Sequence, residues 1–184
     1  VVLPDPGALL PLLWEVMGGL GTDYNLTMGY PLTRTPVYAL LDQILRTLER
    51  ERQGRVRTSD YLALLLHPYV KNLEAGEGST LRIFAHAAQE LLLERGAPYL
   101  DVAAFEGDPD LTDRARRVAG GEEGGSSLVA RLREVHALLL ARPRRSSTVG
   151  ELSEALMEVL REVAARSPAR YHPFFQEFFE RAAQ

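Results

Sequence analysis

The chain contains no cysteine. Disulfide bonds, thiol nucleophiles and cysteine-ligated metal sites are therefore excluded, and the composition fits a reducing compartment. We expect a cytoplasmic location. The chain also lacks any run of eighteen apolar residues, which a membrane-spanning helix requires. We therefore expect no membrane partner, while 46% hydrophobic residues are enough for an ordinary core.

Lysine is almost as rare, because Lys71 stands alone beside twenty arginines. The formal net charge is −4, and a domain dedicated to gripping nucleic acid is usually basic. A local basic face stays compatible with this balance. The preference for arginine has two explanations: the codon bias of a GC-rich genome, or bidentate contacts with phosphate and carboxylate groups.

The familiar catalytic motifs are also missing. The sequence has no phosphate-binding loop, no nucleophile elbow and no dinucleotide glycine fingerprint. The GGLG segment at residues 18–21 lacks the Lys-Ser/Thr that would follow it in a phosphate-binding loop, and it reads as a helix stop. We expect no cofactor and no independent enzyme. An unrecognised helical enzyme stays open as an alternative, which a deep pocket with converging ionisable groups would support.

Four histidines, His67, His86, His136 and His172, lie far apart in the sequence. None belongs to an HExxH motif or to another pattern with metal-ligand spacing, so no metal site is expected. His67 precedes Pro68, which predicts a helix end at this point. A protonated imidazole there would meet the negative pole of the helix.

The N-terminal part alternates between strand and helix signals. Val1–Leu3 and residues 24–28 read as short apolar strands, and residues 5–17 between them read as an amphipathic helix. Residues 25–32, with the sequence NLTMGYPL, end the second strand in a sharp turn at Gly29 and Pro31. Because the chain starts inside an apparent strand and without methionine, we expect it to be a fragment of a longer protein.

From Thr35 onward the hydrophobic period becomes helical. We predict a mainly α fold: a bundle of about six to eight helices with a small N-terminal β-α-β unit, divided into domains at 1–34 and 35–184. The segment GGEEGG at residues 120–125 predicts a mobile loop. The expected helices cover residues 35–53, 58–66, 80–95, 110–119, 126–142 and 148–166, with a last one opening at Pro173.

Three arginine clusters and one aromatic stripe have no assigned role. Each cluster is explained by a solvated helix face, or alternatively by phosphate contacts. The aromatic stripe falls at helical spacing, so it is either core or a docking face. The clusters are Arg50/Arg52/Arg55/Arg57, Arg114/Arg116/Arg117 and Arg142/Arg144/Arg145, and the stripe is Phe174/Phe175/Phe178/Phe179.

Five segments occur in an order that resembles a known family. They are VVLPD, ALLPLL, NLTMGYPL, TPVYALLDQIL and YLALLLHPYV, all between residues 1 and 70. Their order is similar to the helicase-like half of AddB-type and related PD-(D/E)XK nuclease-family proteins, which act in bacterial double-strand-break repair and recombination. The resemblance implies that residues 1–34 are the edge of a RecA-like motor domain, called 2A, and that residues 35–184 are the helical 2B insertion of an inactivated superfamily 1 helicase.

The same resemblance bears on activity. Active relatives carry an arginine that senses ATP after the first strand, whereas this chain has Pro4 and Asp5, and an acidic residue would repel a triphosphate. The resemblance implies DNA contacts near the turn, because hydroxyls and turn N–H groups hold phosphates and a tyrosine can stack on a base. The candidate residues are Thr27, Gly29, Tyr30, Thr33 and Arg34. Alternatively, Tyr30 simply packs the strand against the helices.

Besides the helical enzyme left open above, two functions remain as expectations. The first is a non-catalytic fragment of a helicase-like DNA-repair protein that positions DNA or neighbouring domains. We expect the fragment to be a monomer. Its expected partners are DNA, bound by the full-length parent, and other domains or a helicase-nuclease partner subunit. The second is a helical protein-interaction scaffold with no nucleic-acid contact.

Overall fold

The computed structural model describes residues 32–76 and 79–167. The chain divides into two compact units, Val1–Thr35 and Pro36–Gln184. In the first unit the described element is the short 3-10 helix η3 (Leu32–Arg34). The predicted N-terminal β-α-β unit and the phenylalanine stripe lie outside the described residues. The assignment of residues 1–34 to a motor domain therefore stays a prediction.

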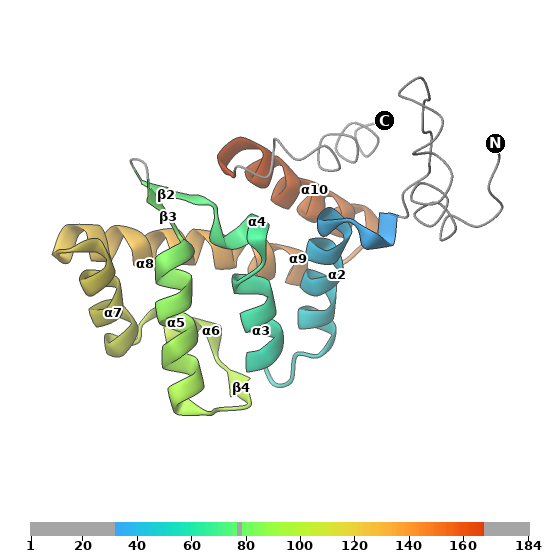
Figure 1. The fold of residues 1–184 in the computed structure, drawn as a ribbon. Helices are drawn as coiled ribbons and strands as arrows, with labels where there is room; N and C mark the ends of the chain where they lie inside the picture. Colours follow the sequence, from blue (N-terminus) through green and yellow to red (C-terminus); the bar gives the residue numbers. More distant parts are fainter. Residues whose placement is uncertain (1–31, 77–78, 168–184) are drawn as a thin grey trace, which may run out of the picture. The chain divides into compact units, whose positions relative to one another are not determined.

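The second unit is mainly α, as predicted, and forms a helical bundle (Figure 1). Short strands lie between some of the helices, and β1 pairs with β4 and β2 with β3, both antiparallel. The elements in chain order are α2 (Pro36–Glu49), β1 (Val56–Arg57), α3 (Thr58–Leu65), α4 (Pro68–Lys71), β2 (Glu74–Gly76), β3 (Ser79–Thr80), α5 (Arg82–Arg95), β4 (Tyr99–Leu100), α6 (Val102–Glu106), α7 (Pro109–Ala119), α8 (Glu122–His136), the π-helix η4 (Ala137–Ala141), α9 (Arg142–Arg144) and α10 (Val149–Arg166).

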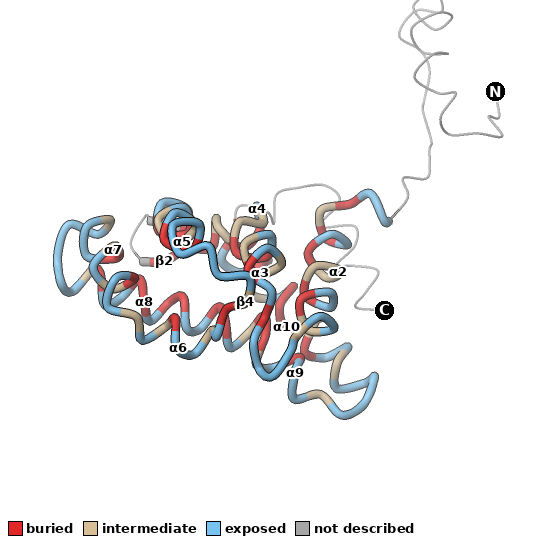
Figure 2. The backbone as a smooth tube through the Cα atoms, turned by 90° about the horizontal axis from the view of Figure 1, so that it is seen from below, coloured by how far each residue is buried: buried red, intermediate tan, exposed pale blue. Residues whose placement is uncertain are grey.

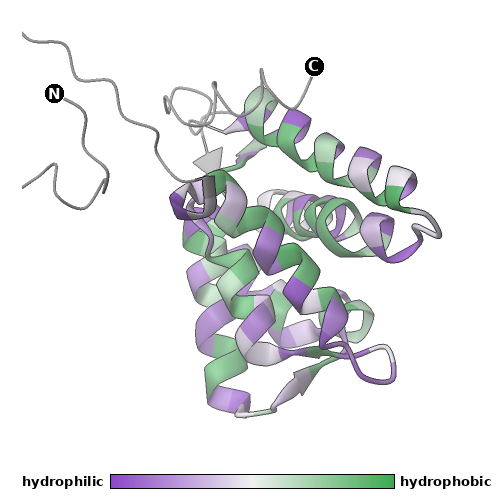
Figure 3. Ribbon diagram, turned by 90° about the vertical axis from the view of Figure 1, so that its right-hand side faces the viewer, coloured by the Kyte–Doolittle hydropathy of each residue, from purple (hydrophilic) through white to green (hydrophobic). Residues whose placement is uncertain are grey.

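The core forms where the apolar sides of the helices meet. In Figure 2 the buried residues lie along the inward sides of the helices, and Figure 3 shows hydrophobic and hydrophilic residues side by side along each helix. Leu40 and Ile44 of α2 are completely buried, four residues apart on one face. The Tyr61 ring of α3 meets the Phe105 ring of α6 edge to face, with ring centroids 6.1 Å apart.

Local end signals place several helices where the sequence predicts them. The Thr148 side chain and the Glu151 side chain form a capping box at the start of α10. Gly96 ends α5 in the left-handed conformation, with φ of 61°. The predicted stop before Pro68 is also confirmed, because α3 ends at Leu65 and α4 begins at Pro68.

The predicted loop at residues 120–125 is wrong, because α8 begins at Glu122 and includes Gly124 and Gly125. The glycines allow close packing instead of chain mobility. A Cβ atom on Gly125 would lie 2.8 Å from the Cα of Arg116 on α7. Only glycine lets the first turns of α8 approach the α7 backbone this closely.

His67 also differs from its predicted role. It is the N-cap of α4, and its Nδ1 accepts a hydrogen bond from the Tyr69 backbone N–H at 3.2 Å. Burial lowers the pKa of His67 to about 4, although a hydrogen bond with the Pro36 backbone partly opposes the shift. His67 therefore caps a helix N-terminus in its neutral form and does not bring a positive charge to a helix C-terminus.

Candidate nucleic-acid interface

A tight hairpin joins α2 to β1. Arg52 and Arg55 exchange both backbone hydrogen bonds at 2.9 Å, and the chain reverses at Gln53 and Gly54 between them. Both turn residues have positive φ, 51° and 75°. This combination is typical of a type I′ turn, which matches the twist of the flanking strands. The turn therefore holds two arginine backbones directly opposite each other.

The arginine side chains of this hairpin share its outer face. Val56 pairs with Leu100 across β1 and β4, and both are buried. Because neighbouring residues in a strand point to opposite faces, the next pair, Arg57 and Tyr99, faces outward. Arg55 lies two residues before Arg57 and so shares its face, together with Arg52 across the turn. We call Arg52, Arg55 and Arg57 the arginine hairpin.

These three arginines lack an acidic partner among the described residues, and all three are exposed. Most other described arginines are paired, for example Arg46 with Asp42 at 2.7 Å and Arg161 with Glu154 at 2.6 Å. Lys71, Arg117 and Arg145 also lack an acidic side-chain partner in the described part of the chain, but none of them has a neighbouring basic residue that lacks one as well. Within the described residues, the arginine hairpin is therefore a local concentration of positive charge without ion-pair partners, on a chain of formal net charge −4.

Of the carboxylates nearest in sequence, Glu49 is exposed and forms no ion pair within the described residues, whereas three others are engaged elsewhere. Glu51 binds Arg144 at 2.6 Å, and Asp60 lies 3.5 Å from Arg50. Asp101 caps α6 by accepting a hydrogen bond from the Ala104 N–H. A hollow of about 510 Å³ remains open beside the turn, and it is lined by Arg52, Gln53, Arg55 and Tyr99. An anion entering this hollow meets arginines and an aromatic ring.

The other two arginine clusters are mostly neutralised. Arg114 lies 2.5 Å from Glu94, and Arg116 lies 2.7 Å from Glu122. In the third cluster Arg142 pairs with Glu158 and Arg144 with Glu51. For these clusters the explanation as solvated, ion-paired surface fits the geometry, and the sequence alone did not separate them from the hairpin.

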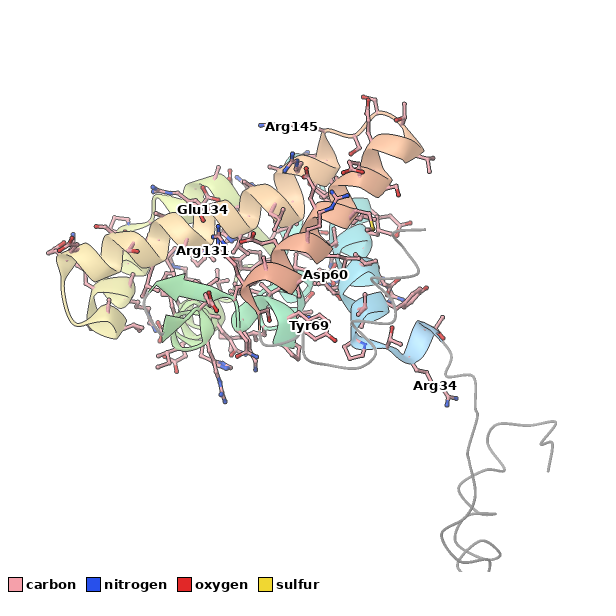
Figure 4. The ribbon with its side chains drawn as sticks, turned by 90° about the horizontal axis from the view of Figure 1, so that it is seen from above. Arg34, Asp60, Tyr69, Arg131, Glu134 and Arg145 are labelled. Carbon is pink, nitrogen blue, oxygen red and sulfur yellow. The ribbon has the colours of Figure 1, made fainter. Side chains whose placement is uncertain are left out.

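A groove of about 600 Å³ lies along α8, η4 and α10. Arg131 lies in it beside Glu134, and Arg145 lies further along (Figure 4). Arg131 donates to Glu134, Glu162 and the Glu74 carbonyl at 2.7, 2.7 and 2.9 Å. Burial lowers the pKa of Arg131, but the hydrogen bonds with Glu162 and Glu134 outweigh it and raise that pKa. Arg131 is thus a brace between α8, β2 and α10.

A buried polar chain connects three helices. The Tyr61 hydroxyl lies 2.9 Å from His136 Nε2, and His136 Nδ1 lies 2.7 Å from Glu106 Oε1. Burial, with a smaller contribution from the Glu106 charge, raises the pKa of Tyr61 far above its ordinary value of 10. A hollow of about 250 Å³ reaches Glu106 and His136. Both ring nitrogens of His136 are engaged, and Tyr61 is buried, so the chain holds α3, α6 and α8 together.

The residues that the resemblance selected are only partly described. Thr33 and Arg34 lie in η3 and are exposed. Thr27, Gly29 and Tyr30 lie outside the described residues. The structure instead brings together the arginine hairpin and Tyr99. Gly54 between arginines is the sequence signal for the turn, but the expected helix over residues 35–53 is too long, because α2 ends at Glu49. Nothing local in the sequence points to Tyr99.

No protein-family model, no curated protein and no solved structure matches this chain. Within residues 32–76 and 79–167, no helix is both long and apolar enough to cross a bilayer. The same residues contain no group of histidine, aspartate and glutamate side chains that could hold a metal ion.

Proposed function

We propose that this helical domain positions nucleic acid without catalysis by holding phosphate groups on the arginine hairpin. One observation carries the proposal: three arginines that have no acidic partner among the described residues lie on one face of a tightly defined turn. Arginine forms bidentate contacts with phosphate oxygens, and such contacts orient a nucleic acid independently of its sequence. The resemblance to helicase-like nuclease-family proteins of double-strand-break repair supports the same role.

The rigid turn matters as much as the charge. A flexible arginine-rich loop would lose side-chain and backbone entropy on binding. Here the paired backbone of Arg52 and Arg55 and the ladder at Arg57 already fix the spacing of the three Cα atoms. The hairpin is therefore preorganised for a chain of phosphates.

Fluorescence anisotropy with a labelled tailed duplex tests this proposal across a range of salt concentrations. We expect a Kd of about 10⁻⁴–10⁻⁶ M near physiological salt, as for sequence-independent binding. The variant R52Q/R55Q/R57Q should weaken binding and flatten the plot of log K against log salt by roughly two to three units, at about 0.7–0.9 per lost contact.

The matched control removes the same three charges from exposed positions elsewhere. Arg117, Arg161 and Arg166 are suitable, because each is exposed and lies on α7 or α10, remote in sequence from the hairpin. The control R117Q/R161Q/R166Q should keep the slope of the original chain. Equal losses in both triple variants, or no binding by the original chain, would contradict the proposal.

A second candidate function is a protein-interaction scaffold, and one surface favours it. A hollow of about 410 Å³ next to the turn is lined partly by Leu45, Leu48, Pro143 and Leu152. Leu45 is 39% exposed. Val149, three residues before Leu152 on α10, is 85% exposed. Sedimentation velocity over a hundredfold concentration range tests self-association through this surface. A strict monomer whose behaviour L45S leaves unchanged would argue against that form of the scaffold.

A further inference from the structure

Tyr99 has an unusual place for an aromatic residue. Its cross-strand partner is Arg57, and its ring lies half-buried at the hollow that Arg52 and Arg55 also line. The Tyr99 hydroxyl has no hydrogen-bond partner within the described residues. A tyrosine that only filled the core would be covered, as Tyr61 is at 1% exposure. Tyr99 therefore offers part of an aromatic surface beside the arginines of the hairpin.

An aromatic face among phosphate-binding groups suits unpaired bases. Each base has a π-face that can stack on an aromatic side chain, and this contact tolerates any sequence. In a duplex the base faces are covered by their neighbours, so the same side chain would reach only the backbone or a strand end. The Tyr99 ring thus increases the affinity for single-stranded nucleic acid but not the affinity for duplex.

The arginine spacing fits an extended strand as well. Arg55 and Arg57 are two residues apart in an extended segment, which corresponds to roughly 6.6 Å at 3.3 Å per residue. Neighbouring phosphates of an extended single strand have a similar separation. Arg52, opposite Arg55, lies on the other side of the turn and can reach a further phosphate across the hollow.

We propose that the arginine hairpin and Tyr99 form a binding site for single-stranded nucleic acid, with one base stacked on Tyr99 and the flanking phosphates held by Arg52, Arg55 and Arg57. This inference rests on the proposed function, because it assumes that the hairpin binds phosphates. It adds the class of ligand and the residue that selects it.

Anisotropy titrations of the whole chain with three labelled probes test the site. The probes are a twelve-nucleotide oligothymidine, a blunt twelve-base-pair duplex and an abasic strand of the same length, each titrated at the same two salt concentrations. The single strand should bind roughly 5- to 150-fold more tightly than the abasic strand, which is the range for one stacked base. It should also bind more tightly than the duplex.

Two variants of Tyr99 separate stacking from folding. Y99L should lose the preference for the base-containing strand and keep the salt dependence, because the arginines remain. Y99F keeps the ring and should bind like the original chain. If all three probes bind equally and Y99L changes nothing, the single-strand site is refuted while phosphate binding by the hairpin stands. If none of the probes binds, both proposals fall.

Discussion

The hydroxyl of Tyr61 and the Nε2 atom of His136 lie 2.9 Å apart, although 75 residues separate them in the chain. This contact links α3 to the last turn of α8. Glu106 fixes the orientation of the imidazole from the other side, because its carboxylate lies 2.7 Å from Nδ1 and accepts a hydrogen bond from the N–H there. The remaining nitrogen can then accept a hydrogen bond from the tyrosine.

Replacing Tyr61 by phenylalanine should destabilise the fold by about 1–3 kcal/mol. The ring and its contact with Phe105 stay, but His136 Nε2 is left buried without a donor. Urea unfolding monitored by circular dichroism measures the loss. E106Q is the control, since an amide oxygen can still accept from Nδ1, and it should cost less. Unchanged stability in Y61F would show that water or a shifted imidazole replaces the hydroxyl.

His67 should make stability fall as the pH drops from about 6.5 to about 4. Its pKa is lower in the folded chain than in the unfolded chain, so the unfolded chain takes up the proton first and is favoured on acidification. Below about pH 4 both states are protonated and this contribution stops changing. The total loss should be about 1–2 kcal/mol, reduced from the full shift because His67 is partly exposed.

The substitution H67N isolates this effect. Asparagine is a good N-cap and can accept the Tyr69 N–H through its side-chain oxygen. The variant should match the original chain near pH 4 or exceed it, and should show a weaker pH dependence between pH 4 and 6.5. Parallel curves for the two proteins, measured by urea unfolding at several pH values, would rule out His67 as the titrating group.

The sequence predicted best those features whose causes are local. The capping box of Thr148 and Glu151, the stop before Pro68 and the left-handed Gly96 each depend on a few neighbouring residues. Prediction from the sequence failed where contacts between distant segments determine the local structure. Gly124 and Gly125 look like loop residues in isolation, yet the approach of α7 makes them interior residues of a helix.

Gly125→Ala should therefore destabilise the protein, contrary to the usual benefit of alanine in a helix. Its Cβ would lie 2.8 Å from both Cα and N of Arg116, and these backbone atoms cannot move aside alone. We expect a cost of about 1–3 kcal/mol from overpacking. Gly150 on α10 is the control, because the nearest atom to its added Cβ is Thr148 Oγ1 at 3.9 Å. G150A should be neutral or slightly stabilising in thermal unfolding.

For the same reason, only part of the candidate site can be predicted from the sequence. Arg52, Arg55 and Arg57 stand close together in the sequence, so the cluster is visible there. The sequence does not distinguish it from the other two arginine clusters. The difference lies in the partners: Arg114 and Arg142 meet carboxylates from other helices, whereas the hairpin arginines meet none in the described part of the chain. Ion pairing between distant segments is a tertiary property. The cross-strand pairing of Arg57 with Tyr99 is also a tertiary property.

The turn itself gives a test in which charge stays constant. Gly54 has φ of 75°, and no atom lies within 4 Å of a Cβ added there, so G54A introduces backbone strain without a clash. We expect a loss of about 1–2 kcal/mol in the stability of the turn and weaker nucleic-acid binding, with all three arginines present. Q53N should act in the opposite direction, because Asn-Gly is the preferred type I′ pair. Anisotropy at two salt concentrations measures both. If G54A bound as tightly as the original chain, the arginines would act through net charge alone, and the preorganised turn would have no part in recognition.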